Sequence, residues 1–292
     1  MSPDDALCDG PRGLRVLTLN VLSFDHADGE RRGRVLADGI QVLRPDLVAL
    51  QEVRWGDGMD DVTDILGRGY HVVPHSQRSD DGVGAALASR WPIGRTAELD
   101  LHVTARTSGF PWCAAVVAEV TAPPPVGPLL FVHHKPSWQY GYEHERELQA
   151  VAAARFVEEH LAERDLHVVL AGDFDATPDA ASVRFWTGRQ SLGGTSVRYD
   201  DAWDVAHPGE RGHTFSPHNP LVRAGEMGLE RGRRIDYVMV RCGIHGPTLD
   251  VAGCHLAFAE PVDGVWASDH VGLLADLARP ATCVGSWDPA VP

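Results

Sequence analysis

Short apolar segments typical of β-strands alternate with amphipathic, helix-like segments along nearly the whole chain. We expect strands at 14–21, 46–53, 70–74, 82–89, 114–120, 129–133, 167–173, 234–241, 248–258 and 271–277. We expect helices at 31–44, 60–66, 142–164 and from Pro178 to about 186. Many short strands with helices between them predict an α/β protein, a two-layer sheet sandwich flanked by helices.

The length of 292 residues allows one or two domains. The proline-rich stretch 123–128 is short enough to be a loop rather than a linker. We therefore predict a flexible N-terminal segment at 1–13, a single domain at 14–278 and a C-terminal tail at 279–292.

The net charge of −15 argues against a broad phosphate-binding surface, because such surfaces are built from many lysines and arginines. No apolar run is long enough for a membrane span, and the acidic N-terminus does not resemble a secretory signal. Five scattered cysteines without a C-x-x-C pair support neither a disulfide framework nor a cysteine zinc site. We expect a soluble cytoplasmic protein and leave its oligomeric state open.

Polar side chains stand at the ends of several apolar strands. A buried carboxylate is costly unless it has a partner, a metal ion or water, so such a set points to chemistry. Taken singly, each residue has a plainer interpretation as a cap or turn residue. The set consists of Asn20, Glu52, His134, Asp173, Asp175, Asp236, Asp269 and His270.

Asp173 and Asp175 are two residues apart, so in an extended strand both carboxylates point the same way. Paired carboxylates of this kind suit Mg²⁺ or Mn²⁺, which prefer hard oxygen ligands. The alternative is a pair of turn residues ahead of a helix that begins near Pro178.

Two histidine segments are candidates for acid–base or phosphate chemistry. Asp269 precedes His270 directly and would point to the opposite face, which makes Asp236 the better partner for that imidazole. A purely structural Asp–His pair is the alternative. Only one imidazole of His133-His134 can face a given cleft; we expect His134 to face it, followed by the positive charge of Lys135.

Several common catalytic motifs do not occur in the sequence. It has neither G-x-x-x-x-G-K-[ST] nor G-x-G-x-x-G, and neither G-x-S-x-G nor H-E-x-x-H. These absences argue against P-loop ATPases, Rossmann dehydrogenases, α/β-hydrolases and zincins.

Six short motifs follow one another in an order that resembles the endonuclease/exonuclease/phosphatase superfamily, which includes DNase I-like nucleases. The resemblance covers about residues 14–278 and implies a four-layer α/β/β/α sandwich of two mainly antiparallel or mixed sheets with outer helices. The motifs are Thr18-Leu-Asn20, Leu50-Gln-Glu52, His133-His-Lys135, Gly172-Asp-Phe-Asp175, Arg234-Ile-Asp-Tyr237 and Ser268-Asp-His270.

This resemblance implies a phosphoesterase that depends on Mg²⁺ or Mn²⁺ and acts by in-line attack of an activated water. Glu52 would be the main metal ligand, supported by Asn20 and Asp269. Asp173 would position or deprotonate the water. Two histidines would act on the phosphate: His270, oriented by Asp236, and His134 from the opposite side.

Asp175 departs from the pattern, because the family usually has asparagine there. An extra anion facing a phosphate would repel it unless it is metal-bound, protonated or turned away. We therefore hypothesise that Asp175 is a ligand of a second or shifted metal ion.

The substrate is less constrained than the reaction. Lys135 and the arginines of 231–234 form a small basic rim or a solvated loop, and Trp138, Tyr140 and Tyr142 stack on substrate or pack within their loop. Asn219, in the segment 213–219, is expected to line the cleft and bind substrate. We favour a small phosphodiester or phosphomonoester over long DNA. The alternatives are a metal-dependent DNA or RNA nuclease and a catalytically silent scaffold that binds a phosphorylated ligand.

Overall fold

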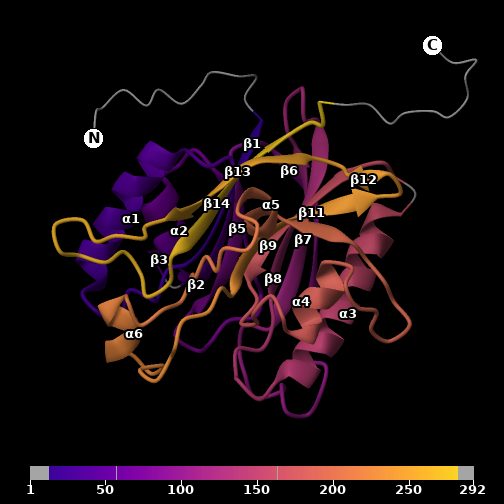
Figure 1. Cartoon of the computed structure of the whole chain (residues 1–292). Coiled ribbons are helices and arrows are strands. Elements are labelled where there is room, and N and C mark those ends of the chain that lie inside the picture. The colour runs from indigo at the N-terminus through magenta and orange to yellow at the C-terminus, as the bar shows by residue number, and fades with distance from the viewer. Residues whose placement is uncertain (1–12, 57, 163, 282–292) are drawn as a thin grey trace, which may run out of the picture.

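Two seven-stranded sheets pack face to face, and helices cover their outer faces (Figure 1). This computed structural model describes residues 13–281, apart from 57 and 163. The arrangement confirms the expected four-layer α/β/β/α sandwich. The predicted N-terminal segment lies outside the described residues except for Gly13, as does the predicted tail except for 279–281.

The first sheet has the strand order β13-β14-β1-β2-β5-β4, and β3 pairs with β2. β1 runs parallel to β2 and antiparallel to β14, so the sheet is mixed. Its strands are β1 (Leu14–Asn20), β2 (Leu47–Gly56), β3 (Met59–Asp60), β4 (His71–Pro74), β5 (Val83–Ser89), β13 (Asp250–Ala257) and β14 (Gly272–Ala278).

The second sheet has the order β10-β11-β9-β8-β7-β6, and β12 pairs with β11. β8 and β9 are parallel, while β9 and β11 are antiparallel. Its strands are β6 (Ile93–Asp100), β7 (Ala114–Thr121), β8 (Pro128–Lys135), β9 (His167–Asp173), β10 (Tyr199–Asp201), β11 (Asp236–Gly243) and β12 (Gly246–Pro247).

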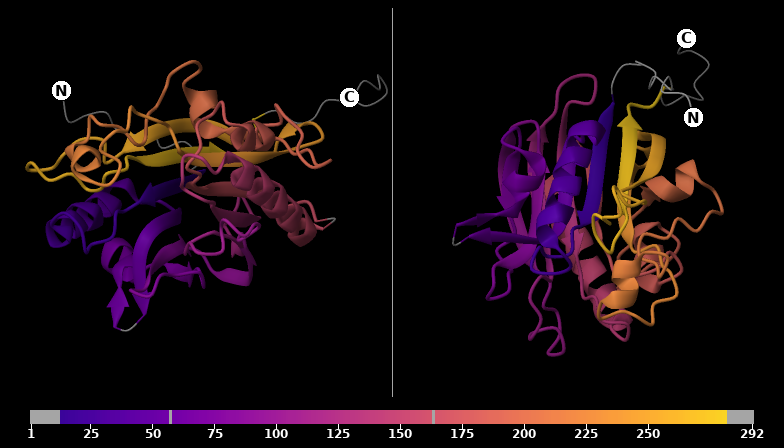
Figure 2. Two further views of the ribbon diagram at one scale, coloured as in Figure 1. Left: turned by 90° about the horizontal axis from the view of Figure 1, so that it is seen from below. Right: turned by 90° about the vertical axis from the view of Figure 1, so that its left-hand side faces the viewer.

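Each sheet has its own pair of covering helices. α1 (Gly29–Leu43) and α2 (Asp61–Leu66) pack on the first sheet, and α3 (Glu143–Leu161) and α4 (Ala181–Trp186) pack on the second. Figure 2 shows α1 and α3 on opposite sides of the molecule. Two short helices, α5 (Ala202–Ala206) and α6 (Pro220–Ala224), lie in the connections. Among the described residues, no helix combines the length and apolarity that a membrane span requires.

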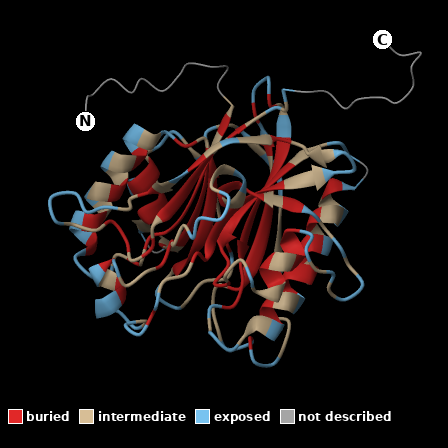
Figure 3. Ribbon diagram, viewed as in Figure 1, coloured by how far each residue is buried: buried red, intermediate tan, exposed pale blue. Residues whose placement is uncertain are grey.

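Alternation of side chains along the strands builds three apolar layers. The central strands are buried over most of their length (Figure 3). On β8, Leu129 and Phe131 pack between the sheets, whereas Leu130 and Val132 pack beneath the helices α3 and α4. Central strands that are covered on both faces are apolar throughout, which explains why the sequence pattern predicted them well.

The elements that the sequence did not predict include an edge strand and two very short helices. The edge strand β6 is mostly exposed or half-buried and pairs only with β7. α5 and α6 have five residues each and show no helical periodicity. The helix expected from Pro178 begins at Ala181.

Gly172, next to Asp173 on β9, is required by the close approach of β8. A Cβ atom at Gly172 would lie 2.1 Å from the carbonyl oxygen of His134, and the φ of Gly172 is 155°.

We expect Gly172→Ala to lower the free energy of unfolding by about 3 kcal/mol or more, because the backbone must move to relieve the overlap. Urea denaturation measures this change. Gly109→Ala, whose Cβ would meet nothing within 4 Å, is the control, and equal losses in the two variants would contradict the explanation.

Candidate active site

A cavity of about 500 Å³ opens where the ends of strands from both sheets meet. The first sheet contributes the end of β1, the bulge of β2 and residues that precede β14, and the second sheet contributes the ends of β8 and β9. The polar residues that line it include Asn20, Glu52, Lys135, Asp173, Asp175, Asp269 and His270. The sequence predicted all seven as site residues, and the fold brings them to one place.

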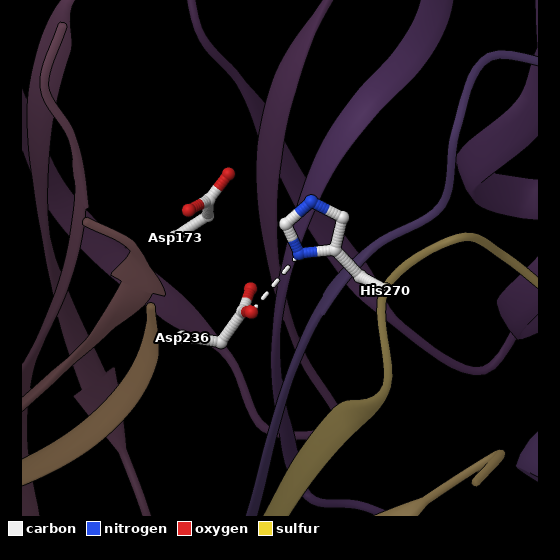
Figure 4. Close-up of side chains that lie close together, drawn as sticks. All are labelled: Asp173, Asp236 and His270. Carbon is white, nitrogen blue, oxygen red and sulfur yellow. Dashed lines mark hydrogen bonds and ion pairs between the residues drawn. The ribbon is translucent and has the colours of Figure 1, made fainter. Parts of the chain in front are cut away.

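Asp173 and Asp236 are direct neighbours in the antiparallel β9–β11 pair, so their side chains lie on the same face of the sheet. Oδ2 of Asp236 lies 3.0 Å from Nδ1 of His270 (Figure 4). One ligand atom from each of these three residues lies within 4.8 Å of the other two. The Asp236–His270 pair predicted from the sequence is therefore present.

The charges in this cluster support one another. Burial lowers the pKa of His270, but Asp236 and Asp173 outweigh it and raise the pKa to about 10. Burial raises the pKa of Asp173, but Lys135 and His270 hold it below its ordinary value. At neutral pH the imidazole is therefore doubly protonated beside an ionised Asp173.

Asn20 and Glu52 come from neighbouring parallel strands. Glu52 sits at a β-bulge of β2 with a φ of 60°, and this irregularity interrupts the alternation between Gln51 and Val53. Nδ2 of Asn20 donates to Oε1 of Glu52 at 2.9 Å and to Oδ2 of Asp173 at 3.3 Å. Asn20 thus connects the acids of the two sheets.

Glu52, Asn20 and Asp269 fit a divalent metal ion chemically. Burial and the negative charge of Asp269 raise the pKa of Glu52, and a divalent cation beside the two carboxylates would offset this unfavourable charge. Carboxylate and amide oxygens are the ligands that Mg²⁺ and Mn²⁺ prefer. Glu52 on β2 and Asp269 in the loop before β14 line the same cavity.

Ser268 and Arg32 stabilise the loop after β1 and the loop before β14. The sequence analysis did not predict a role for either residue. Oγ of Ser268 donates to the Asn20 carbonyl at 2.7 Å and accepts from the His270 N–H at 3.2 Å. Arg32, buried on α1, donates to six backbone carbonyls, five of them in the segment 21–27. In the sequence, only the position of Arg32 on the apolar face of the predicted helix at 31–44 could have indicated that its guanidinium is buried.

The structure places Asp175 in an ion pair, which changes the hypothesis of a second metal ion. Nζ of Lys135 lies 2.9 Å from Oδ2 of Asp173 and also contacts Oδ2 of Asp175. Burial lowers the pKa of Lys135, but the two carboxylates outweigh it and raise the pKa. Lys135 therefore offsets part of the charge of Asp175 without a metal ion, although burial and the neighbouring Asp173 keep the pKa of Asp175 above its ordinary value.

The prediction that His134 faces the cleft needs correction. His134 is buried on the helix-covered face of the second sheet, where it contacts the rings of Phe174 and Trp186, and it is absent from the cavity lining. His133, the imidazole that should then face away from the cleft, is also buried, and it contacts Gln51. The residue of this segment that reaches the cavity is Lys135.

Asn219 also differs from its predicted role in substrate binding. It is buried and caps α6 through the Leu221 N–H, while its Nδ2 donates to the carbonyls of Ser268 and Asp269. Asn219 therefore fixes α6 against the loop that contains Ser268 and Asp269. Leu221 and Val222 of that helix line the cavity in its place.

The predicted basic rim is largely neutralised. Arg234 is buried in an ion pair with Asp201 and Asp204. Arg233 lines the cavity, paired with Glu230 and stacked on the ring of Tyr140. Trp138 lines the cavity too, 37% exposed, so it is available to a ligand.

The model of the Endonuclease/Exonuclease/phosphatase family matches residues 17–270, a range that contains every residue of the cavity described above. The chain belongs to this family. No curated protein matches it in sequence.

Solved structures share its fold at low sequence identity. D. rerio TDP2 in complex with a single-strand DNA product is 21% identical, with a TM-score of 0.69 over 90% of this chain and 98% of that one. The human Nocturnin catalytic domain with a bound sulfate anion is 18% identical, with a TM-score of 0.68 over 92% and 94%. An endonuclease/exonuclease/phosphatase from Bacteroides vulgatus is 20% identical, with a TM-score of 0.67 over 91% and 99%.

The buried histidines predict a steep loss of stability in acid. Burial lowers the pKa of His134 and His75 to about 3 each, whereas an unfolded histidine titrates near 6.5. Stability present above about pH 6.5 is therefore lost as the pH falls toward 3, by about 1.4 kcal/mol per pH unit for each histidine. Urea unfolding between pH 7 and 4 measures the slope.

His134→Phe, which suits the aromatic surroundings of Phe174 and Trp186, should reduce this slope by about 1.4 kcal/mol per pH unit. His255→Gln, at an exposed position, is the control and should leave it unchanged. A slope in His134→Phe equal to that of the wild type would contradict the burial of a neutral imidazole.

Proposed function

We propose that this chain is a divalent-metal-dependent phosphoesterase that hydrolyses a small phosphodiester or phosphomonoester. The observation that carries the proposal is the convergence in one cavity of Glu52, Asn20 and Asp269 with Asp173 and the Asp236–His270 pair. Family membership supports hydrolysis of phosphate esters. Because the sequence identity to the solved structures is low, we infer the class of substrate from the residues that line the cavity.

Glu52, Asn20 and Asp269 would hold the metal ion. A bound Mg²⁺ or Mn²⁺ polarises a phosphoryl oxygen and offsets charge that develops on it. Three residues of this chain carry out the remaining tasks. Asp173, ionised and held by Asn20 and Lys135, positions a water and takes its proton.

His270 donates from its second ring nitrogen to a phosphate oxygen, because Asp236 occupies the first. An ammonium has three N–H donors, and Lys135 uses two of them on Asp173 and Asp175. The third is available to the phosphate. This assignment gives Lys135 the phosphate contact that the sequence had suggested for His134.

The surroundings favour a small substrate. The cationic side chains Lys135, Arg233 and His270 of the cavity wall are already paired with acids, and the chain as a whole carries a charge of −15. Few charges are left to follow a long phosphate backbone. The apolar side chains of Trp138, Leu221 and Val222 would contact the organic part of the ester.

Hydrolysis of bis-p-nitrophenyl phosphate and p-nitrophenyl phosphate in Mg²⁺, Mn²⁺ or EDTA tests the proposal. We expect activity with the metal ions and none in EDTA. His270→Gln and Asp173→Asn should each lower kcat/KM by roughly 10²–10⁴-fold, the usual contribution of a positioned acid or base. His255→Gln should behave as the wild type. Activity that persists in EDTA, or in His270→Gln, would overturn the mechanism.

Metal binding can be tested without turnover. Isothermal titration calorimetry with Mn²⁺ should show binding to the wild type and at least about tenfold weaker binding to Glu52→Gln, which removes a charged ligand. Glu98→Gln, an acid outside the cavity lining, is the matched control. Equal affinity in Glu52→Gln and the wild type would place the ion elsewhere.

Salt dependence separates a small substrate from a nucleic acid. KM for the small esters should change little between 50 and 200 mM salt, whereas a nuclease with six to ten phosphate contacts loses roughly 10³-fold or more in affinity. Steeply salt-dependent cleavage of DNA or RNA would favour the nuclease. Metal binding without hydrolysis of any ester would favour the silent scaffold.

A further inference from the structure

Lys135, Asp173 and Asp175 form a compact buried cluster at the ends of β8 and β9. The exposed fractions of their side chains are 5%, 1% and 10%. One ammonium contacts an oxygen of each carboxylate. The three groups together carry a single negative charge, the same as Asp173 would carry with two neutral neighbours.

The backbone aims Asp175 at Lys135. Asp175 has a φ of 53°, a left-handed conformation that aspartate and asparagine adopt more readily than most residues. Its N–H donates to Oδ1 of Asp173 at 3.1 Å, and its carbonyl accepts from Arg233 at 3.4 Å. These contacts fix the turn, so an asparagine at this position keeps the same backbone.

Hydrogen bonds as well as charge fix the carboxylate of Asp173 within this cluster. Asp173 receives hydrogen bonds from Lys135 and Asn20 at Oδ2 and from the Asp175 N–H at Oδ1. Removal of Lys135 alone leaves Asp175 facing Asp173 with no cation between them, which is costly in a buried site. Removal of both charges leaves Asp173 beside neutral groups.

We propose that Lys135 and Asp175 act as one positioning unit, an ion pair that fixes the carboxylate of Asp173 in the orientation that hydrolysis needs. This inference rests on the proposed function, in which Asp173 receives the proton of the attacking water. It assigns to Asp175 a role in holding Lys135, in place of the coordination of a second metal ion.

The test is a double-mutant cycle with Lys135→Met, Asp175→Asn and the combined variant, assayed for kcat and KM on the esters named above with Mn²⁺. Lys135→Met should lose the most activity, mainly in kcat. The combined variant should recover kcat by about tenfold or more over Lys135→Met, because it removes the unpaired buried anion. Circular dichroism and urea unfolding establish that each variant is folded.

A matched cycle at the peripheral pair Arg241–Glu158, whose Nε–Oε1 distance is 2.8 Å, is the control. Arg241→Met, Glu158→Gln and their combination should leave kcat and KM unchanged, since this pair lies outside the cavity lining. Loss and recovery of kcat at both pairs would indicate a general effect of breaking ion pairs and would overturn the specific role of Lys135 and Asp175.

Two further outcomes would overturn the inference. One is a combined variant no more active than Lys135→Met. The other is a decrease in the number of Mn²⁺ ions bound by Asp175→Asn in calorimetry, which would make Asp175 a metal ligand. An inactive wild type would overturn the proposed function itself, whereas an active wild type without recovery in the cycle would overturn the pairing alone.

Discussion

Repulsion among the carboxylates that meet at the end of the sandwich is the constraint on which the rest of the site depends. Five acids approach one cluster from both sheets, where burial makes unbalanced charge expensive. They are Glu52, Asp173, Asp175, Asp236 and Asp269. Each stays there only because a cation or a donor reaches it, and the positions of those partners decide which acids are free for chemistry.

The partners divide the acids into three groups. Asp236 is held by His270, while Asp173 and Asp175 share Lys135. Glu52 has a hydrogen bond from Asn20 but no ion pair with any residue that the structure describes, and Asp269 lies near it. The acids of the first sheet are thus the ones left for a divalent ion, whereas the acids of the second sheet are held by Lys135 and by His270. This division explains why the metal and the water-activating carboxylate would occupy different sides of one cavity.

The sequence predicted the sandwich and the acids because both depend on local patterns. Fully apolar runs mark strands covered on both faces, and a carboxylate at the end of such a run is conspicuous. The edge strand β6 and the short helix α6 have no such pattern, so only the tertiary structure defines them. Family resemblance added the order of the motifs and hence the four layers.

The hydrogen-bond partners of the site residues were harder to predict from the sequence than the strands on which these residues lie. The alternation along β8, with Leu129 and Phe131 facing the other sheet, already places Lys135 on that side and His134 on the helix side. The expectation for His134 neglected this alternation. The contact between Lys135 and Asp175 joins residues 40 positions apart and follows from the register of two parallel strands, which no local pattern encodes.

Arg32 stabilises the loop after β1 through the backbone of the loop and not through polar side chains. Its guanidinium holds the carbonyls of residues 21, 22, 23, 26 and 27, and every residue type has a carbonyl. The path of this loop is therefore held largely by one arginine of the next helix through backbone atoms, and the side chains of Leu22 and His26 on the cavity wall take no part in that support. Mutational drift can thus remodel this part of the cavity rim without disturbing the adjoining Asn20.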